Sequence, residues 1–230
     1  MATRDLWLFN YNDSMAYDRF SQCEDPRGLI ERYIEAKYDL GDCTILEIGA
    51  GSGKFTSFLA RSCKELFVVE RADGLMTINR MKNHRPNTHF ILSDVKALKL
   101  PANSIDVIFG GWSLTSMRDD FPGIFRVLRK VLKPNGKIII VENAGGDEFS
   151  RITGIEALSK SMYEYYRRIG FYTEIVIATT IELPDAEVFH RAFPNQSTID
   201  LNSLSIRHNI SIMKANAEDL PKEDRRYENY

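Results

Sequence analysis

Short apolar segments recur along the first two thirds of the chain, and amphipathic segments with helical spacing separate them. The apolar segments are rich in β-branched residues, as is typical of buried parallel strands. They are Ile45–Ile48, Leu66–Glu70, His89–Leu92, Ile105–Phe109 and Lys137–Glu142. The helical patterns between them are Lys54–Cys63, Asp73–Asn83 and Asp119–Leu132. This alternation predicts an α/β fold with a doubly wound parallel sheet.

The last third of the chain has a different pattern. Its periodicity predicts one long helix over Ser150–Arg168, which Gly170 caps. Alternating segments then predict two strands, Tyr172–Ile181 and Ser205–Met213. The polar end of the chain, 215–230, is expected to be frayed.

No repeat or linker interrupts the 230 residues, so we interpret 1–230 as a single domain. Its expected parts are a helical cap (1–40), a ligand-binding core (42–142), a helical insertion (143–170), the last two strands (171–214) and a polar tail (215–230). The hydrophobic fraction of 43% and the charged fraction of 27% are ordinary for a globular protein.

Charge and cysteine usage narrow the class of protein. Thirty Lys and Arg against 32 Asp and Glu leave a net charge of -2, so no basic excess favours a nucleic-acid partner. Three isolated cysteines, Cys23, Cys43 and Cys63, indicate a reducing compartment without structural disulfides or a zinc site. No signal peptide or membrane-spanning run is visible. We therefore expect a cytoplasmic protein with no membrane partner and no metal.

A glycine-rich loop follows the first predicted strand. Gly49, Gly51 and Gly53 alternate with other residues before a helical segment begins. Glycine is required where the backbone takes a positive φ or where a ligand lies against the main chain. Three such positions between a strand and a helix predict a ligand on this turn, near the helix N-terminus.

Two carboxylates help to define that ligand. Glu47 lies on the strand before the loop, and Glu70 ends the second strand, where an acidic side chain can accept hydrogen bonds from ribose hydroxyls. The loop has G-x-G-x-G spacing, with Lys54 where a dinucleotide fingerprint would place a glycine. Dinucleotide binding is therefore the weaker interpretation.

From Asp42 to Glu142 the chain resembles the class I S-adenosylmethionine-dependent methyltransferases. The resemblance rests on five motifs in the family's order. They are Glu47-Ile-Gly-Ala-Gly-Ser-Gly53, Glu70, Ser93-Asp94-Val95, Asp106-Val-Ile-Phe-Gly-Gly-Trp112 and Leu132-Lys-Pro-Asn-Gly136. The resemblance implies a three-layer fold with strand order 3-2-1-4-5-7-6, in which strand 7 is antiparallel.

The resemblance also implies residues that bind the cofactor. The loop backbone, including Ala50, is expected to lie against the methionine part, with Glu70 on the ribose, Asp94 on the adenine amino group and Val95 on the ring. Gly110, Gly111 and Trp112 are expected to border the sulfonium. Tyr17, or Tyr11, is expected to reach the cofactor's carboxylate from an N-terminal helix. Arg71 departs from the family pattern, which has an apolar residue there, but its stem or guanidinium can still stack on the adenine.

No Ser-His-Asp set or metal cluster is visible, so the candidates for catalysis are few. Glu142 and Asn143 end the fifth strand, and His190 lies in a predicted short helix near the pocket. Tyr163 and Tyr166 are further candidates to line the acceptor pocket, although packing is the simpler interpretation. His208 shares a strand face with isoleucines, which favours a hydrogen-bonded core histidine.

These residues predict transfer of a methyl group from S-adenosylmethionine to an O, N or C atom of a small molecule, with S-adenosylhomocysteine as product. Aromatic side chains in the least patterned segments indicate a partly apolar acceptor. Three alternatives stay open: a methyltransferase for tRNA or protein, a non-catalytic module with this fold, and a nicotinamide-dependent oxidoreductase. A homodimer is also compatible with the sequence.

Overall fold

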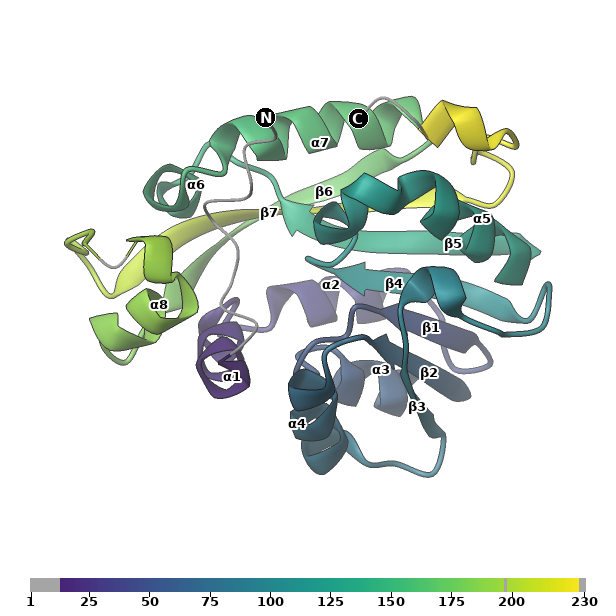
Figure 1. Ribbon diagram of the computed structural model, residues 1–230, viewed down its shortest axis with the longest axis horizontal. Helices are drawn as coiled ribbons and strands as arrows, with labels where there is room; N and C mark the ends of the chain where they lie inside the picture. Colours follow the sequence, from purple (N-terminus) through teal and green to yellow (C-terminus); the bar gives the residue numbers. More distant parts are fainter. Residues whose placement is uncertain (1–12, 197, 228–230) are drawn as a thin grey trace.

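A computed structural model describes residues 13–196 and 198–227, which form a sheet between two layers of helices (Figure 1). The trace of Tyr11, and of everything before residue 13, lies outside the described residues. The seven strands are β1 Thr44–Ile48, β2 Glu65–Glu70, β3 Thr88–Leu92, β4 Ile105–Gly111, β5 Leu132–Asn143, β6 Tyr172–Glu182 and β7 Ser205–Asn216.

The strand order is β3-β2-β1-β4-β5-β7-β6. The pairs among β1 to β5 are parallel, whereas β7 runs antiparallel to both β5 and β6. The order and the antiparallel seventh strand confirm the predicted fold class. Parallel strands leave their carboxyl ends along one edge, where ligands of doubly wound sheets bind.

Helices cover both faces of the sheet because each strand alternates its apolar side chains between them. On one face, α5 (Phe121–Val131) and α7 (Glu156–Arg168) pack on Leu46, Ile108 and Ile138. On the other, α2 (Leu29–Lys37) and α3 (Thr56–Ser62) pack on their neighbours Ile45, Val107 and Ile139. The α4 helix, Asp73–Asn83, lies beside α3 and has the predicted bounds.

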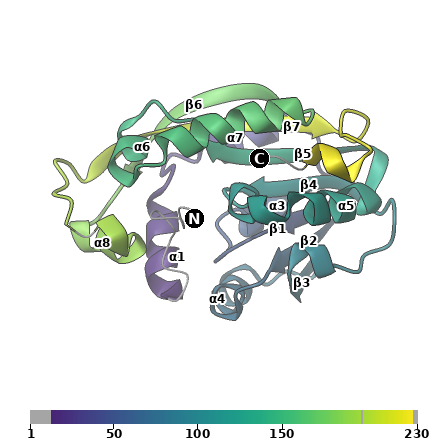
Figure 2. The ribbon, with the colours of Figure 1, turned by 45° about the horizontal axis from the view of Figure 1, so that its top comes forward.

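A third apolar cluster joins three helices at one end of the molecule. Phe20 of α1 (Ser14–Cys23) contacts Phe149 of α6 (Glu148–Thr153) and Phe193, which follows α8 (Ala186–Ala192). Figures 1 and 2 both show α1 and α8 side by side, beyond the edge of the sheet. This cluster brings the N-terminal helix close to the last third of the chain.

The prediction of one long helix over 150–168 is wrong. Gly154 adopts φ +74 and ends α6, and its N–H donates to the Ser150 carbonyl. A second helix, α7, then begins at Glu156. The apolar periodicity continues across the break, so the helical pattern conceals a left-handed glycine cap. Gly170, with φ +97, follows α7 as predicted.

The expectation of a frayed tail is also wrong for its described part. Tyr227 is 1% exposed, and its ring stacks on Phe125 with centroids 4.4 Å apart. Arg129 of α5 donates to the carbonyls of Pro221 and Lys222. The polar composition hid this docking, because it depends on one buried tyrosine and main-chain acceptors.

Four short 3₁₀ turns complete the described chain, at Val95–Ala97, Thr115–Asp120, Pro194–Gln196 and Asp224–Tyr227. Among the described residues, no helix is both long and apolar enough to cross a membrane.

Candidate active site

The glycine loop is held in place by the Glu70 carboxylate. Gly51 N donates to Glu70 Oε2 over 2.9 Å, and the backbone N–H groups of Arg71 and Ala72 donate to Oε1 over 2.8 Å. A carboxylate accepts about four hydrogen bonds. Glu70 therefore fixes the loop and retains capacity for a further donor.

A polar cavity of about 400 Å³ lies beside this loop. Its lining includes ten residues on or near the predicted site, and all of them except Ala72 and Ser93 are predicted to bind the cofactor. They are Tyr17, Gly49, Gly51, Glu70, Arg71, Ala72, Ser93, Asp94, Val95 and Trp112. Its size falls within the range of small-molecule sites. The structure therefore brings the first four predicted motifs together around one space.

The two loop glycines that line this cavity, Gly49 and Gly51, have little room for a side chain. At Gly49, φ is +59 and an added Cβ would lie 2.5 Å from Ser113 Cβ. At Gly51, φ is +55 and an added Cβ would lie 3.0 Å from Tyr17 Oη. Tyr17 therefore lies directly against the loop, and α1 closes this side of the cavity.

Two predicted cofactor residues do not line the described cavities. An added Cβ at Gly53 would meet the side chain of Asn79 or Asn83, and Asn83 Nδ2 donates to the Gly53 carbonyl. Gly110 is packed against Ser113 and Ile48. Gly53 and Gly110 therefore shape the loop and the end of β4 from the side away from the cavities.

Lys54, which replaces the third glycine of a dinucleotide fingerprint, anchors the N-terminal helix. Its Nζ donates to the carbonyls of Ser21 and Glu24 over 2.7 and 2.6 Å. The helix predicted to start at Lys54 begins two residues later, at Thr56. The lysine thus ties the end of α1 to the glycine loop.

A small recess next to the loop holds the remaining motif residues. Glu47, Ala50 and Gly111 line it, with Lys54 and Trp112. Burial raises the pKa of Glu47 to about 8, although Thr56 Oγ1 donates to its Oε2 over 2.7 Å and opposes that shift. The folded protein therefore favours the protonated form of Glu47.

Trp112 lies where the cavities meet. It lines the polar cavity, the recess and a third cavity, described next. Its indole stacks on Phe55 and on His208, with centroids 5.7 and 6.1 Å away. Its backbone adopts φ +49, and its buried Nε1 has no hydrogen-bond partner among the described residues. A residue other than glycine with a positive φ is a common feature of functional sites.

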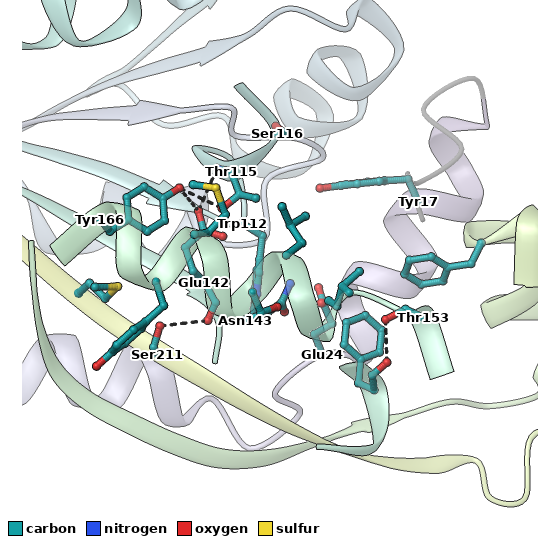
Figure 3. Close-up of a pocket in the computed structure, with 18 residues that line it drawn as sticks. Tyr17, Glu24, Trp112, Thr115, Ser116, Glu142, Asn143, Thr153, Tyr166 and Ser211 are labelled. Atoms are coloured by element: carbon teal, nitrogen blue, oxygen red, sulfur yellow. Dashed lines mark hydrogen bonds between the residues drawn. The ribbon is translucent and has the colours of Figure 1, made fainter. Parts of the chain in front are cut away.

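The third cavity, here called the aromatic cavity, lies between β5, α6 and α7 (Figure 3). Aromatic and apolar side chains form most of its wall, and its volume is about 60 Å³. The aromatic residues are Tyr17, Trp112, Phe149, Tyr163, Tyr166 and Phe193. Tyr17, Trp112 and Ser116 are shared with the polar cavity, so the two spaces adjoin.

Glu142 is a buried carboxylate on the wall of the aromatic cavity. Thr115 N and Tyr166 Oη donate to its Oε1 over 3.1 and 3.2 Å (Figure 3). Burial raises the pKa of Glu142 to about 7, and these hydrogen bonds limit the shift. Near neutral pH this carboxylate can therefore both accept and release a proton.

Neither His208 nor His190 is placed to exchange a proton in this cavity as Glu142 is. His208 is 0% exposed, and its Nε2 lies 2.8 Å from Asn143 Oδ1, as expected of a core histidine. Burial lowers its pKa to about 4, so it is neutral. His190 lines none of the described cavities, and its Nε2 donates to the Ile199 carbonyl over 3.0 Å. The structure brings Glu142 and Asn143 to the cavity but not His190.

Sequence reasoning missed Glu24, which lines both the aromatic cavity and the recess. It is 6% exposed, and burial raises its pKa to about 7 despite the nearby Lys54. It lies just beyond α1, in a segment without a recognisable motif. Its bridge to Ile181 of β6 and the bond from Lys54 to its carbonyl, both between distant parts of the chain, bring it into the site.

Comparison with known families agrees with this geometry. A family described as "Methyltransferase domain" matches residues 46–140, which hold the glycine loop, Glu70, Asp94 and Trp112. These residues form a class I methyltransferase domain. The cofactor of this methyltransferase domain is S-adenosylmethionine.

Curated relatives of the methyltransferase domain include two enzymes with the same name. Phosphoethanolamine N-methyltransferase 1 of Zea mays is 33% identical over 136 residues, which cover 57% of this chain and 26% of that one. The Caenorhabditis elegans enzyme of that name is 30% identical over 144 residues, covering 58% and 29%. The chain thus spans less than a third of the length of these relatives.

Solved structures share the fold of this chain. A S-adenosylmethionine-dependent methyltransferase from Aquifex aeolicus superposes with a TM-score of 0.59 at 15% identity, covering 89% of this chain and 98% of that one. Phosphoethanolamine N-methyltransferase 1 of Haemonchus contortus, in complex with phosphoethanolamine and S-adenosylhomocysteine, gives 0.58 at 14% identity, covering 95% and 50%.

Proposed function

We propose that this protein transfers the methyl group of S-adenosylmethionine to a small molecule bound in the aromatic cavity. The observation that supports the proposal most strongly is the meeting of two unlike cavities at Trp112. One is polar and surrounded by the methyltransferase motifs, and the other is walled by aromatic side chains. The relatives named phosphoethanolamine N-methyltransferases also favour a small acceptor.

The polar cavity suits the cofactor chemically. Glu70 has remaining acceptor capacity for ribose hydroxyls. Asp94 uses only Oδ1 to cap the turn at Lys96, which leaves Oδ2 for the adenine amino group. Val95 lies on the cavity wall beside Asp94, and Gly49 and Gly51 let a ligand approach the main chain. We assign Tyr17 and the recess around Glu47 to the methionine end.

When bound, S-adenosylmethionine supplies a methyl group that its sulfonium makes electrophilic. The protein's own task is to position the acceptor and to exclude water, which can contribute on the order of 7–11 kcal/mol. Trp112 and Tyr17 lie between the two cavities and orient the two reactants. Glu142 accepts the proton that an attacking nitrogen or oxygen atom loses, while Thr115 and Tyr166 hold the carboxylate in place.

The test has two parts. Calorimetry should show binding of S-adenosylhomocysteine to the wild-type protein, and a labelled methyl group should pass from S-adenosylmethionine to an acceptor in a metabolite mixture. Glu142→Gln should lower kcat on the order of 100-fold, the usual contribution of a general base, with the Kd for S-adenosylhomocysteine within twofold.

Glu187→Gln is the matched control, because the Glu187 side chain is 71% exposed and pairs only with Arg191 at 3.9 Å. It should leave kcat unchanged. Binding of S-adenosylhomocysteine without methyl transfer to any acceptor would instead indicate a non-catalytic module. Equal loss of activity in both variants would contradict the role of Glu142.

A further inference from the structure

The described lining of the aromatic cavity includes acidic side chains but no basic ones. Two carboxylates, those of Glu24 and Glu142, lie among its lining residues. The described residues of this wall include no lysine, arginine or histidine. In the view of Figure 3, Trp112 and Asn143 are drawn between the two carboxylates. A molecule in this cavity therefore meets acidic side chains and, among the described lining residues, no basic ones.

Glu24 and Glu142 differ in how the protein satisfies them. Glu142 accepts hydrogen bonds from Thr115 and Tyr166. Glu24 is 6% exposed, and no hydrogen bond or ion pair found among the described residues reaches its carboxylate, although the charge of nearby Lys54 favours its ionised form. Lys54 bonds the Glu24 main-chain carbonyl instead. A buried carboxylate without a donor is costly and calls for a partner.

The backbone around Glu24 is built to hold that side chain in the cavity. Asp25 adopts φ +47, which is unusual for a residue other than glycine. Its carboxylate accepts from Ile30 N over 2.9 Å and from Thr179 Oγ1 over 3.0 Å. Together with the bridge between Glu24 and Ile181, these bonds lock the turn to β6. The position of Glu24 is thus fixed by the fold.

We propose that Glu24 binds an ammonium group of the acceptor, an inference that rests on the proposed function. The acceptor is therefore an amine that carries no phosphate group. Aromatic rings and carboxylates together form a favourable environment for a small organic cation. An ammonium adds positive charge beside these two carboxyl groups, whereas a phosphate would add like charge. The volume of about 60 Å³ accommodates the amine-bearing end of such a molecule.

An ammonium could also come from the methionine end of the cofactor, because Glu24 borders the recess as well. The acceptor is favoured because Lys54, which lines that recess, brings its own positive charge to the cofactor side. The experiment below separates the two sources by measuring both affinities.

Matched pairs of small probes test the proposal. Propylamine and 1-propanol, 2-phenylethylamine and 2-phenylethanol, and ethanolamine and phosphoethanolamine are titrated calorimetrically with and without saturating S-adenosylhomocysteine. We expect at least one amine to bind about 10-fold more tightly than its alcohol, or more. Ethanolamine should bind more tightly than phosphoethanolamine.

Glu24→Gln, which keeps the shape and removes the charge, should reduce the amine preference to within about twofold and leave the Kd for S-adenosylhomocysteine unchanged. Glu187→Gln should keep the full preference. The proposal is wrong if no amine binds better than its alcohol, if phosphoethanolamine binds better than ethanolamine, or if the preference survives in Glu24→Gln. Weaker S-adenosylhomocysteine binding with an intact amine preference would assign Glu24 to the cofactor and also overturn it.

Failure of the proposed function gives a different result. The wild-type protein would then show no methyl transfer or no affinity for S-adenosylhomocysteine, while the probe pairs still report on Glu24 directly.

Discussion

The two cavities that meet at Trp112 are built in different ways. The polar cavity depends on main-chain groups: glycines that make room, and backbone N–H groups that Glu70 holds in one arrangement. The aromatic cavity depends on side chains from distant segments, among them Glu24, Glu142, Phe149 and Tyr166. A main-chain site tolerates few changes and recurs across a family, whereas a side-chain site can change its ligand by substitution.

The largest effect should follow the loss of the carboxylate that organises the polar cavity. Glu70→Ala leaves three backbone N–H groups without an acceptor and removes the proposed ribose contact. We expect the Kd for S-adenosylhomocysteine to rise about 100-fold or more, measured by calorimetry. Asp94→Ala should cost less, about 10-fold, because Asp94 accepts only the one main-chain bond, from Lys96. If both variants bind like the wild type, the cofactor assignment is wrong.

Crowding around the glycine loop should affect the free energy of unfolding of variants at Gly49. Gly49→Ala combines a positive φ with a clash against Ser113, so the free energy of unfolding should fall by about 3 kcal/mol. Gly154→Ala also has a positive φ, but its Cβ meets nothing within 4 Å, so it should cost only about 1 kcal/mol. Denaturant titration measures both. Equal losses would show that the close contact at Gly49 contributes nothing.

The buried Glu47 carboxyl group should make the free energy of unfolding depend on pH. Its pKa is raised from 4.5 to about 8, so the folded state favours the protonated form. The contribution of Glu47 to the free energy of unfolding is complete below about pH 4.5 and is lost as the pH rises to about 8. Glu47→Gln removes that decline. We expect the difference in Tm between Glu47→Gln and the wild type to be about 5 °C more favourable to the variant at pH 9 than at pH 5.5.

The Glu47 measurement uses the protein without ligand, and Glu187→Gln should show no such change. A constant difference in Tm across this pH range would mean that Glu47 is ionised in the folded protein.

The smallest effect belongs to the side-chain cavity. Tyr166→Phe removes one hydrogen bond that favours the ionised form of Glu142, so the pKa of that carboxylate should rise from about 7. The acid limb of the kcat profile should move to higher pH, with kcat at pH 7 lower by about threefold to tenfold. The Kd for S-adenosylhomocysteine should stay within twofold. A change in that affinity would show that the cavities are not independent.

The same contrast explains what the sequence could predict. The resemblance implied the strand order, helical periodicity gave the α4 bounds, and the convergence of Gly49, Glu70 and Asp94 follows from motifs that end parallel strands. The break at Gly154 and the docking of Tyr227 escaped prediction because apolar periodicity hides a left-handed cap and polar composition hides a single buried ring. Glu24 carries no signal, since its burial depends on a long-range pairing with β6.

The position of Trp112 has a practical consequence. The chain has two tryptophans, Trp7 and Trp112, so Trp7→Phe would leave a single intrinsic fluorophore at the junction of the cavities. Its emission should respond to occupancy of either neighbouring space. Stopped-flow fluorescence of that variant would then give the order in which the two reactants bind, without a label or a coupled assay.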